Sequence, residues 1–262
     1  MFSSNNFTRL FCLYSFFWSV SALASDGVLE INQACALNGG CFSGDDAGFP
    51  VTISSPGSYR LTSSLSVGNP DKLAIDITAD RVSLDLNGFA VTICVGVFCG
   101  IGDGNHAIQA LVSNELRIHN GLVQGAIKNC IVVGSHAQLR NLIIKDCGIG
   151  IGAGSFARIS DVAVIDSTGH GVSMGLNSVL ARSTVSGSGL FAVSVDSSAL
   201  IVDSVLDSNG GAIGTSGFIN FLKGGYRGNI ITRNDGKNED QQITSVMENL
   251  GGNICGTDTT CP

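Results

Sequence analysis

A repeat over residues 118–213 constrains this chain more than any other feature. Apolar residues recur in three columns at steps of 20 or 21 residues. The columns are Ile118, Leu139, Ile159, Leu180 and Leu200; Val123, Ile144, Val164, Val185 and Val205; and Ile131, Ile151, Val172, Val193 and Ile213. Repeats of this length are typical of solenoids, in which each unit packs only against its neighbours.

The residues between the columns indicate strands rather than helices. Short β-branched runs, such as residues 162–165, favour strands. Gly, Ser, Asn and Asp separate these runs and favour turns. The sequence therefore predicts an all-β fold of about seven or eight coils, each made of three short strands, with neighbouring coils ~4.8 Å apart.

Over residues 57–236 this pattern resembles the right-handed parallel β-helix proteins of the pectin-lyase-like superfamily, in particular small exported bacterial members without an assigned activity. The resemblance implies a single-stranded right-handed parallel β-helix. Relatives include polysaccharide lyases, polygalacturonases, phage tail spikes and adhesins. Fold analogy across such a set does not choose a function.

The two ends of the chain are expected to be different from the repeat. Residues 1–24 read as a secretory signal peptide, because Arg9 precedes an apolar run and Ala22 and Ala24 match the small-residue cleavage pattern. We expect an N-terminal cap over residues 25–56, the β-helix over 57–236 and a C-terminal cap over 237–262. The protein is then secreted or periplasmic, with no membrane span after signal removal.

The cysteines agree with export. Cys12 lies within the signal peptide, and six others form close pairs: Cys35 with Cys41, Cys94 with Cys99, and Cys255 with Cys261. Such spacing in an exported protein predicts disulfide-closed loops, two of them at the end caps. Cys130 and Cys147 either pair or remain buried thiols. No zinc-type spacing is present, so no metal site is expected here.

Composition argues against some partners. The formal net charge is −7 and there is no basic block, which disfavours nucleic acid. An acidic chain also repels polyuronic acids at long range unless a cation bridges the two. Aromatic residues are few, at 6%.

The strongest catalytic hint is Gly169-His170-Gly171, which resembles the Gly-His-Gly segment of polygalacturonases. Asp146-Cys147 resembles that family's Asp-Asp-Cys segment, although Lys145 replaces its first Asp. The family's Asn-Thr-Asp and Arg-Ile-Lys segments are absent. The alternative is that His170 is a packed ring, because its column neighbours are Ile149 and Phe191.

A second candidate is an acidic column of Asp146, Asp166 and Asp207, interrupted by Gly187. Asp146 and Asp166 one coil apart, ~5 Å, could serve retaining glycoside hydrolysis or bind Ca²⁺. The alternative is that they are turn residues bonding to their own backbone. A further column, Asn120, Asn141, Asp161 and Arg182, predicts a polar ladder with an ion pair between Asp161 and Arg182.

These observations favour a non-enzymatic exported module that presents a sheet face and loops to a polysaccharide or cell-surface glycan. The loop around Cys94 and Cys99 lengthens one coil and is a candidate binding feature. The alternative is a polysaccharide hydrolase or lyase that uses His170, Asp146 and Asp166. No cofactor is expected, with Ca²⁺ left open.

Overall fold

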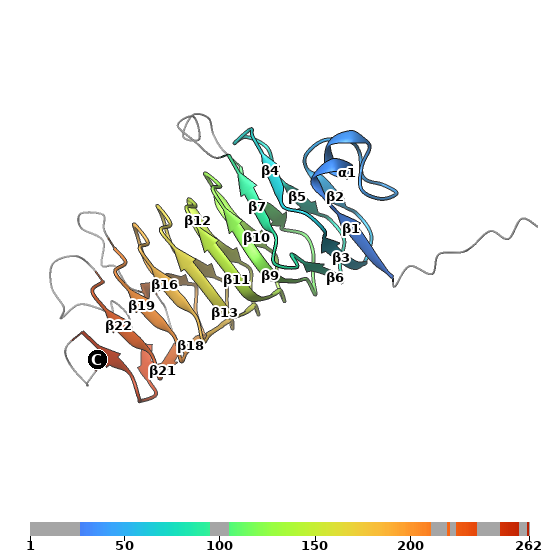
Figure 1. The fold of residues 1–262 in the computed structure, drawn as a ribbon. Coiled ribbons are helices and arrows are strands. Elements are labelled where there is room, and N and C mark those ends of the chain that lie inside the picture. Colours follow the sequence, from blue (N-terminus) through green and yellow to red (C-terminus); the bar gives the residue numbers. More distant parts are fainter. Residues whose placement is uncertain are drawn as a thin grey trace, which may run out of the picture.

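The computed structural model is a right-handed parallel β-helix of about 8 turns, so the predicted fold is confirmed. It describes residues 27–94, 105–210, 219–220, 224–234, 247–256 and 261. The coils stack along one axis from the blue N-terminal strands to the red C-terminal strands (Figure 1). The predicted signal peptide, Cys99 and the loop at residues 95–104 lie outside the described residues.

Two parallel sheets form the walls of the solenoid. Sheet A is 16-stranded and covers two faces, because β9, β11 and β13 are long and bend across the corner between them. On its first face the strands are β1 (Val28–Ile31), β3 (Gly57–Leu61), β6 (Val82–Asp85), β9 (Arg117–Gln124), β11 (Gln138–Lys145), β13 (Arg158–Ile165), β15 (Val179–Ala181), β18 (Ala199–Val202), β21 (Gly224–Arg227) and β23 (Met247–Asn249).

The second face of sheet A contains the later parts of the three long strands, together with β4 (Leu65–Val67), β7 (Ala90–Ile93), β16 (Thr184–Ser186), β19 (Val205–Asp207), β22 (Ile230–Thr232) and β24 (Ile254–Cys255). Sheet B is 8-stranded and contains β2 (Val51–Ile53), β5 (Ile75–Ile77), β8 (Ile108–Ala110), β10 (Asn129–Val133), β12 (Ile149–Ala153), β14 (Val172–Met174), β17 (Val193–Val195) and β20 (Ile219–Asn220).

The apolar columns form the core as predicted, up to about residue 195. Ile118, Leu139, Ile159 and Leu180 pair in register and are buried. In the next coil the predicted column members are wrong by one residue. Ile201 pairs with Leu180, and Leu206 pairs with Val185, and both are fully buried.

Leu200 and Val205 instead face outward, and Asp207 pairs with Ser186 rather than with the corner residue Gly187. The reason is that side chains alternate along a strand, so a register shift of one residue exchanges the two faces. Both members of the Leu200-Ile201 pair are apolar, and composition alone does not choose between them. The predicted core residue Ile213 lies outside the described residues, and Ile219 pairs with Val193.

Each coil turns through three sharp corners, each marked by one residue with positive φ. Among the described residues, all non-glycine residues with positive φ fall in three columns. The corner columns are Arg81, Glu115, His136, Phe156, Asn177 and Ser198; Asn87, Asn120, Asn141, Asp161, Arg182 and Asp203; and Cys94, Asp146, Asp166, Ser208 and Arg233. Asn, Asp and Gly enter this left-handed region most readily, which explains their recurrence in the repeat.

The segments predicted as caps contain the first and last strands of the stack. β1 pairs with β3 and β2 pairs with β5, while α1 (Gln33–Asn38) follows β1. At the other end, β23 and β24 extend sheet A. Within the described ranges, no helix has the length and apolar character needed to cross a bilayer.

Two of the predicted disulfides, Cys35–Cys41 and Cys255–Cys261, are present, and Cys130–Cys147 is a third disulfide. The open question on Cys130 and Cys147 is settled, because they are paired and buried, with 5.6 Å between their Cα atoms. Cys94 is also disulfide-bonded.

Candidate functional site

His170 lies in a packed setting beside sheet B. Its ring stacks on Phe191 of the next coil, with centroids 5.3 Å apart and planes 6° from parallel. The backbone N–H of Phe191 donates to His170 Nδ1 at 3.3 Å. This hydrogen bond leaves Nε2 to carry the proton of the neutral ring. Burial lowers the pKa of His170, so the ring favours the neutral form.

His106, three coils before His170, makes the same hydrogen bond. The backbone N–H of Asn129 donates to His106 Nδ1 at 3.1 Å. Burial, and after it the charge of Lys128, lower the pKa of His106. Because the same hydrogen bond recurs in a chain segment without the Gly-His-Gly motif, the geometry at His170 agrees with the packed alternative.

Asp146 and Asp166 lie at the corner that follows β11 and β13, and both side chains are exposed. Each backbone N–H bonds the next coil, Asp146 to the carbonyl of Ile165 and Asp166 to that of Ser186. Neither carboxylate has a hydrogen bond to His170 in the described part of the chain. Their catalytic roles therefore stay a prediction.

The predicted continuation of this acidic column to Asp207 is wrong. Asp207 lies on the outer side of β19, where it accepts hydrogen bonds from Arg233 and Thr232, and Ser208 occupies the corner. The Arg233 guanidinium holds the pKa of Asp207 below its ordinary value. In the described ranges, no three His, Cys, Asp or Glu side chains gather as a metal-binding group.

The polar corner ladder is confirmed. Asn141 donates to Asn120 at 3.3 Å, and Asn120 donates to Asp85 at 3.2 Å. Arg182 makes two hydrogen bonds of 2.8 Å to Asp161, as the ion-pair prediction required. Because the Arg182 and Asp161 side chains are both exposed, their ion pair adds little to stability.

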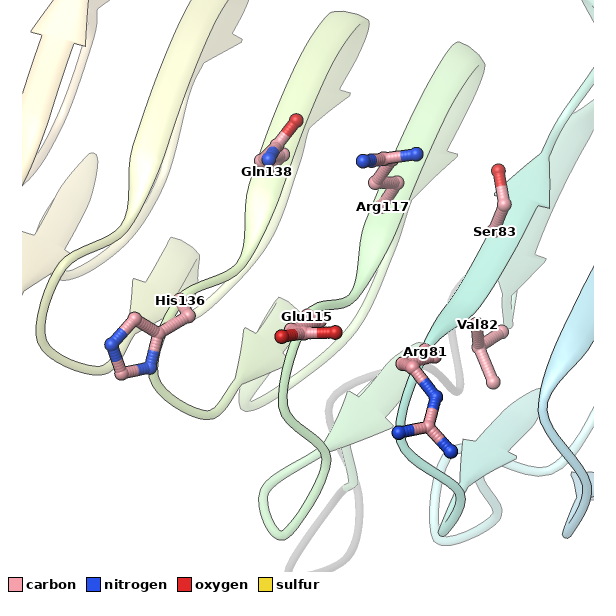
Figure 2. A pocket seen from close by; sticks show the side chains of 7 residues that line it. All are labelled: Arg81, Val82, Ser83, Glu115, Arg117, His136 and Gln138. Carbon is pink, nitrogen blue, oxygen red and sulfur yellow. The ribbon is translucent and has the colours of Figure 1, made fainter.

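A groove that the sequence did not single out lies at the corner where β6, β9 and β11 begin. It has a volume of about 510 Å³ and is lined by Arg81, Val82, Ser83, Glu115, Arg117, His136 and Gln138. Figure 2 shows Glu115 between Arg81 and His136 on consecutive corners, with Arg117 and Gln138 on the adjoining strands. All lining residues except Val82 are polar.

The register of sheet A explains this gathering. Ser83, Arg117 and Gln138 occupy the same outward position on three successive strands, and Arg158 continues the row on β13. The corner residues just before these strands also face solvent, because a one-residue left-handed corner turns its side chain away from the core. Two adjacent rows of polar side chains thus run along the solenoid axis.

One end of the groove carries a ring stack. His136 lies parallel to Phe156 of the next coil, with centroids 5.0 Å apart and planes 5° from parallel. Unlike His170, His136 is exposed, and Phe156 is 48% exposed. The sequence-based prediction that aromatic groups are scarce holds for the chain as a whole, but the structure places this ring pair beside the groove.

Farther along the strands, His119 lies 3.5 Å from Asp85, which also pairs with Arg60. Burial lowers the pKa of His119, Asp85 raises it, and the charges of Arg140 and Arg60 lower it further. Asp85 is therefore engaged by Arg60 and His119 in addition to Asn120. Among the residues that line the groove, the acidic one is Glu115.

Two solved structures resemble this architecture. Dettilon tailspike protein (gp208) matches with a TM-score of 0.50 at 12% identity, over 81% of this chain and 45% of that chain. The likeness is in the parallel β-helix architecture. The A-module of the mannuronan C-5 epimerase AlgE4 of Azotobacter vinelandii matches with a TM-score of 0.34 at 13% identity, over 90% of this chain and 89% of that chain.

This chain spans less than half the length of the tailspike protein. At these identities the likeness concerns the fold alone. No protein-family model matches the chain, and no curated protein matches it.

A signal for the groove was present in the sequence. Arg117, Gln138 and Arg158 recur at the same step as the apolar columns and stand one residue before core positions Ile118, Leu139 and Ile159. Because strand side chains alternate, this row had to face outward. The spacing of these polar residues therefore predicts the outward row that lines the groove.

Proposed function

We propose that this protein is an exported, non-enzymatic module that binds a polysaccharide along the outer face of sheet A. The observation that carries the proposal is the groove of about 510 Å³ lined by guanidinium, imidazole, amide and hydroxyl groups. Planar polar side chains placed along an open groove suit the many hydroxyl groups of a sugar chain. The disulfides fit an oxidising compartment outside the cytosol.

The state of the predicted catalytic residues supports a binding role. His170 is half-buried and its Nδ1 is occupied by a backbone N–H. A general acid or base needs a free position within hydrogen-bond reach of the substrate and a matched pKa. Asp146 and Asp166 are exposed corner residues, a setting that agrees with their alternative role in turns.

The test is a binding screen of the purified, oxidised protein against plant, algal and bacterial polysaccharides by affinity gel electrophoresis. We expect retardation by at least one polymer. Gln138→Ala should weaken binding, because Gln138 lines the groove. Gln109→Ala is the matched control, since Gln109 also faces outward from a strand but lies on sheet B. No retardation by any polymer, or equal loss from both variants, would contradict the proposal.

A second function, polysaccharide cleavage, is favoured by one observation: Glu115 and His136 line the same groove on consecutive corners. A carboxyl group and an imidazole are the groups most used in general acid–base catalysis. The same polymers should be followed for new reducing ends and unsaturated products. Cleavage abolished by Glu115→Gln but not by Glu30→Gln would establish an enzyme in the groove, whereas cleavage abolished by His170→Ala or Asp166→Ala would place it at the residues predicted from sequence.

A further inference from the structure

Three arginines stand together on the outer face of sheet A. Arg117 and Arg158 share one outward row and are separated by a single coil, so their backbones lie ~10 Å apart. Arg140 lies on the intervening strand, two residues beyond Gln138 and in the neighbouring outward row. All three side chains are exposed. Together they form the arginine triangle of β9, β11 and β13.

None of the three guanidinium groups has an acidic partner. Within the described ranges, no carboxylate lies in salt-bridge distance of Arg117, Arg140 or Arg158, and none of the three side chains donates a hydrogen bond. Three other arginines of the described residues are neutralised, whereas Arg81 and Arg227 also lack a salt bridge there. Arg60 pairs with Asp85, Arg182 with Asp161 and Arg233 with Asp207.

This arrangement is unexpected for a chain whose formal net charge is −7. Acidic residues are plentiful, yet near the triangle Asp85 is engaged by Arg60 and His119 and Asp161 by Arg182, which leaves Glu115. Like charges held near one another repel, and an anionic ligand relieves that repulsion. The guanidinium fork also matches the geometry of carboxylate and sulfate groups, which it binds through two parallel hydrogen bonds.

We propose that the arginine triangle binds the carboxylate or sulfate groups of an anionic polysaccharide, whose chain runs along the solenoid axis over β6, β9, β11 and β13. This inference rests on the proposed function and names its ligand class. Arg117 and Arg158 contact anionic groups on one side of the polymer, and Arg140 contacts a group on the other side. Gln138, between the two arginines of its row, bonds a hydroxyl group of the intervening sugar.

The chemistry favours direct contact over a bridging cation. The sequence alone predicted that an acidic chain repels polyuronic acids unless a cation mediates. The local charge reverses that expectation, because three arginines without a salt bridge share this face, whereas Asp146 and Asp166 lie at another corner. Binding through the triangle therefore needs no added Ca²⁺ and weakens as salt screens the charges.

The experiment compares matched polymers on the purified, oxidised protein in the presence of a chelator. Polygalacturonate is paired with its methyl ester, and dextran sulfate with dextran, so that each pair differs in charge on one backbone. Binding is measured by calorimetry at low and at physiological salt. We expect the anionic member of at least one pair to bind more tightly, and the two pairs distinguish carboxylate from sulfate recognition.

The decisive variant replaces Arg117, Arg140 and Arg158 together by Gln. We expect about 100-fold weaker binding at low salt, because charged hydrogen bonds contribute more than neutral ones and each tenfold corresponds to ~1.4 kcal/mol. The control replaces Lys72, Lys128 and Arg233 by Gln, which removes the same charge from exposed positions away from the triangle. It should bind within about twofold of the natural protein, since distant charges are largely screened.

The outcomes separate the two levels of the proposal. Equal binding of charged and neutral polymers, unaffected by the triangle variant, would overturn the ligand class and leave polysaccharide binding standing. No binding of any polymer would overturn the proposed function itself. Binding of single-stranded DNA as tight as that of the polysaccharides, with the same loss in the triangle variant, would show a general polyanion site and overturn the assignment to a glycan.

Discussion

The corners that carry His170 and His136 contain the same pair of rings in different surroundings. Each histidine stacks parallel on a phenylalanine one coil later, at 5.3 and 5.0 Å respectively. His170 is half-buried and accepts a backbone N–H, whereas His136 is exposed in a groove beside Glu115. The Gly169-His170-Gly171 motif predicted a catalytic role for His170. The surroundings of each histidine, rather than the motif, determine which ring is accessible to a ligand.

The largest expected difference between the two sites is in how tightly the chain around His170 is packed. Adding a Cβ at Gly171 would place it 2.7 Å from both the Ala192 carbonyl oxygen and the Ser188 hydroxyl, and also against Val185. We expect Gly171→Ala to lower the free energy of unfolding by ~1–3 kcal/mol, because a filled core cannot accept an extra carbon without strain.

Denaturant unfolding measures this loss. The control is Gly68→Ala, since a Cβ at Gly68 meets nothing within 4 Å. A neutral result for Gly171→Ala would mean that the corner at His170 is loosely packed, and the contrast with His136 would lose its basis.

Removal of the His170 ring or the His136 ring should give a smaller difference in the free energy of unfolding. His170→Ala loses a stacked ring and leaves the Phe191 N–H without its acceptor, so we expect a loss of ~1–2 kcal/mol in unfolding free energy. His136→Ala should change it by less than ~0.5 kcal/mol, because exposed side chains contribute little to stability. Binding should show the reverse order, and equal effects of the two variants on stability would refute the distinction.

The smallest effect is expected in the pH dependence of stability. Burial lowers the pKa of His170 in the folded protein, while the unfolded chain keeps the ordinary value of 6.5. As the pH falls through 6.5, the unfolded state binds a proton that the folded state resists, so stability decreases toward acid. His106 and His119 act in the same direction.

His170→Gln should therefore reduce the loss of stability between pH 7 and pH 5, measured as the shift in thermal midpoint. Gln109→Ala serves as the control and should leave the slope unaltered, since an amide side chain does not titrate. A steeper slope in the His170 variant would contradict the assigned direction of its pKa.

The C-terminal coils contain a buried ladder of polar residues. Ser204, Asn229 and Asn253 are buried and joined coil to coil, with side-chain oxygens accepting backbone N–H groups at 2.9 Å. The repeat predicts stacked asparagines only at the exposed corner of Asn120 and Asn141. Burial of a polar column depends on which side of the corner it faces, and that direction follows from the backbone path.

The sequence by itself determined the architecture. An apolar residue every 20 or 21 positions can be buried only if successive coils stack in register, and the Asn, Asp and Gly residues between strands supply left-handed corners. The same repeat predicted the Asp161–Arg182 pair, while the close spacing of cysteines predicted the disulfides Cys35–Cys41 and Cys255–Cys261.

Only the tertiary structure decided the register of the paired strands and which side chains lie close together. Leu200 and Ile201 are both apolar. Ile201 is buried because it pairs with the core residue Leu180 of the preceding coil. The unpaired arginines at 117, 140 and 158 are 18 to 41 residues apart in sequence. They become one site because each coil returns the chain to the same face ~4.8 Å farther along the axis.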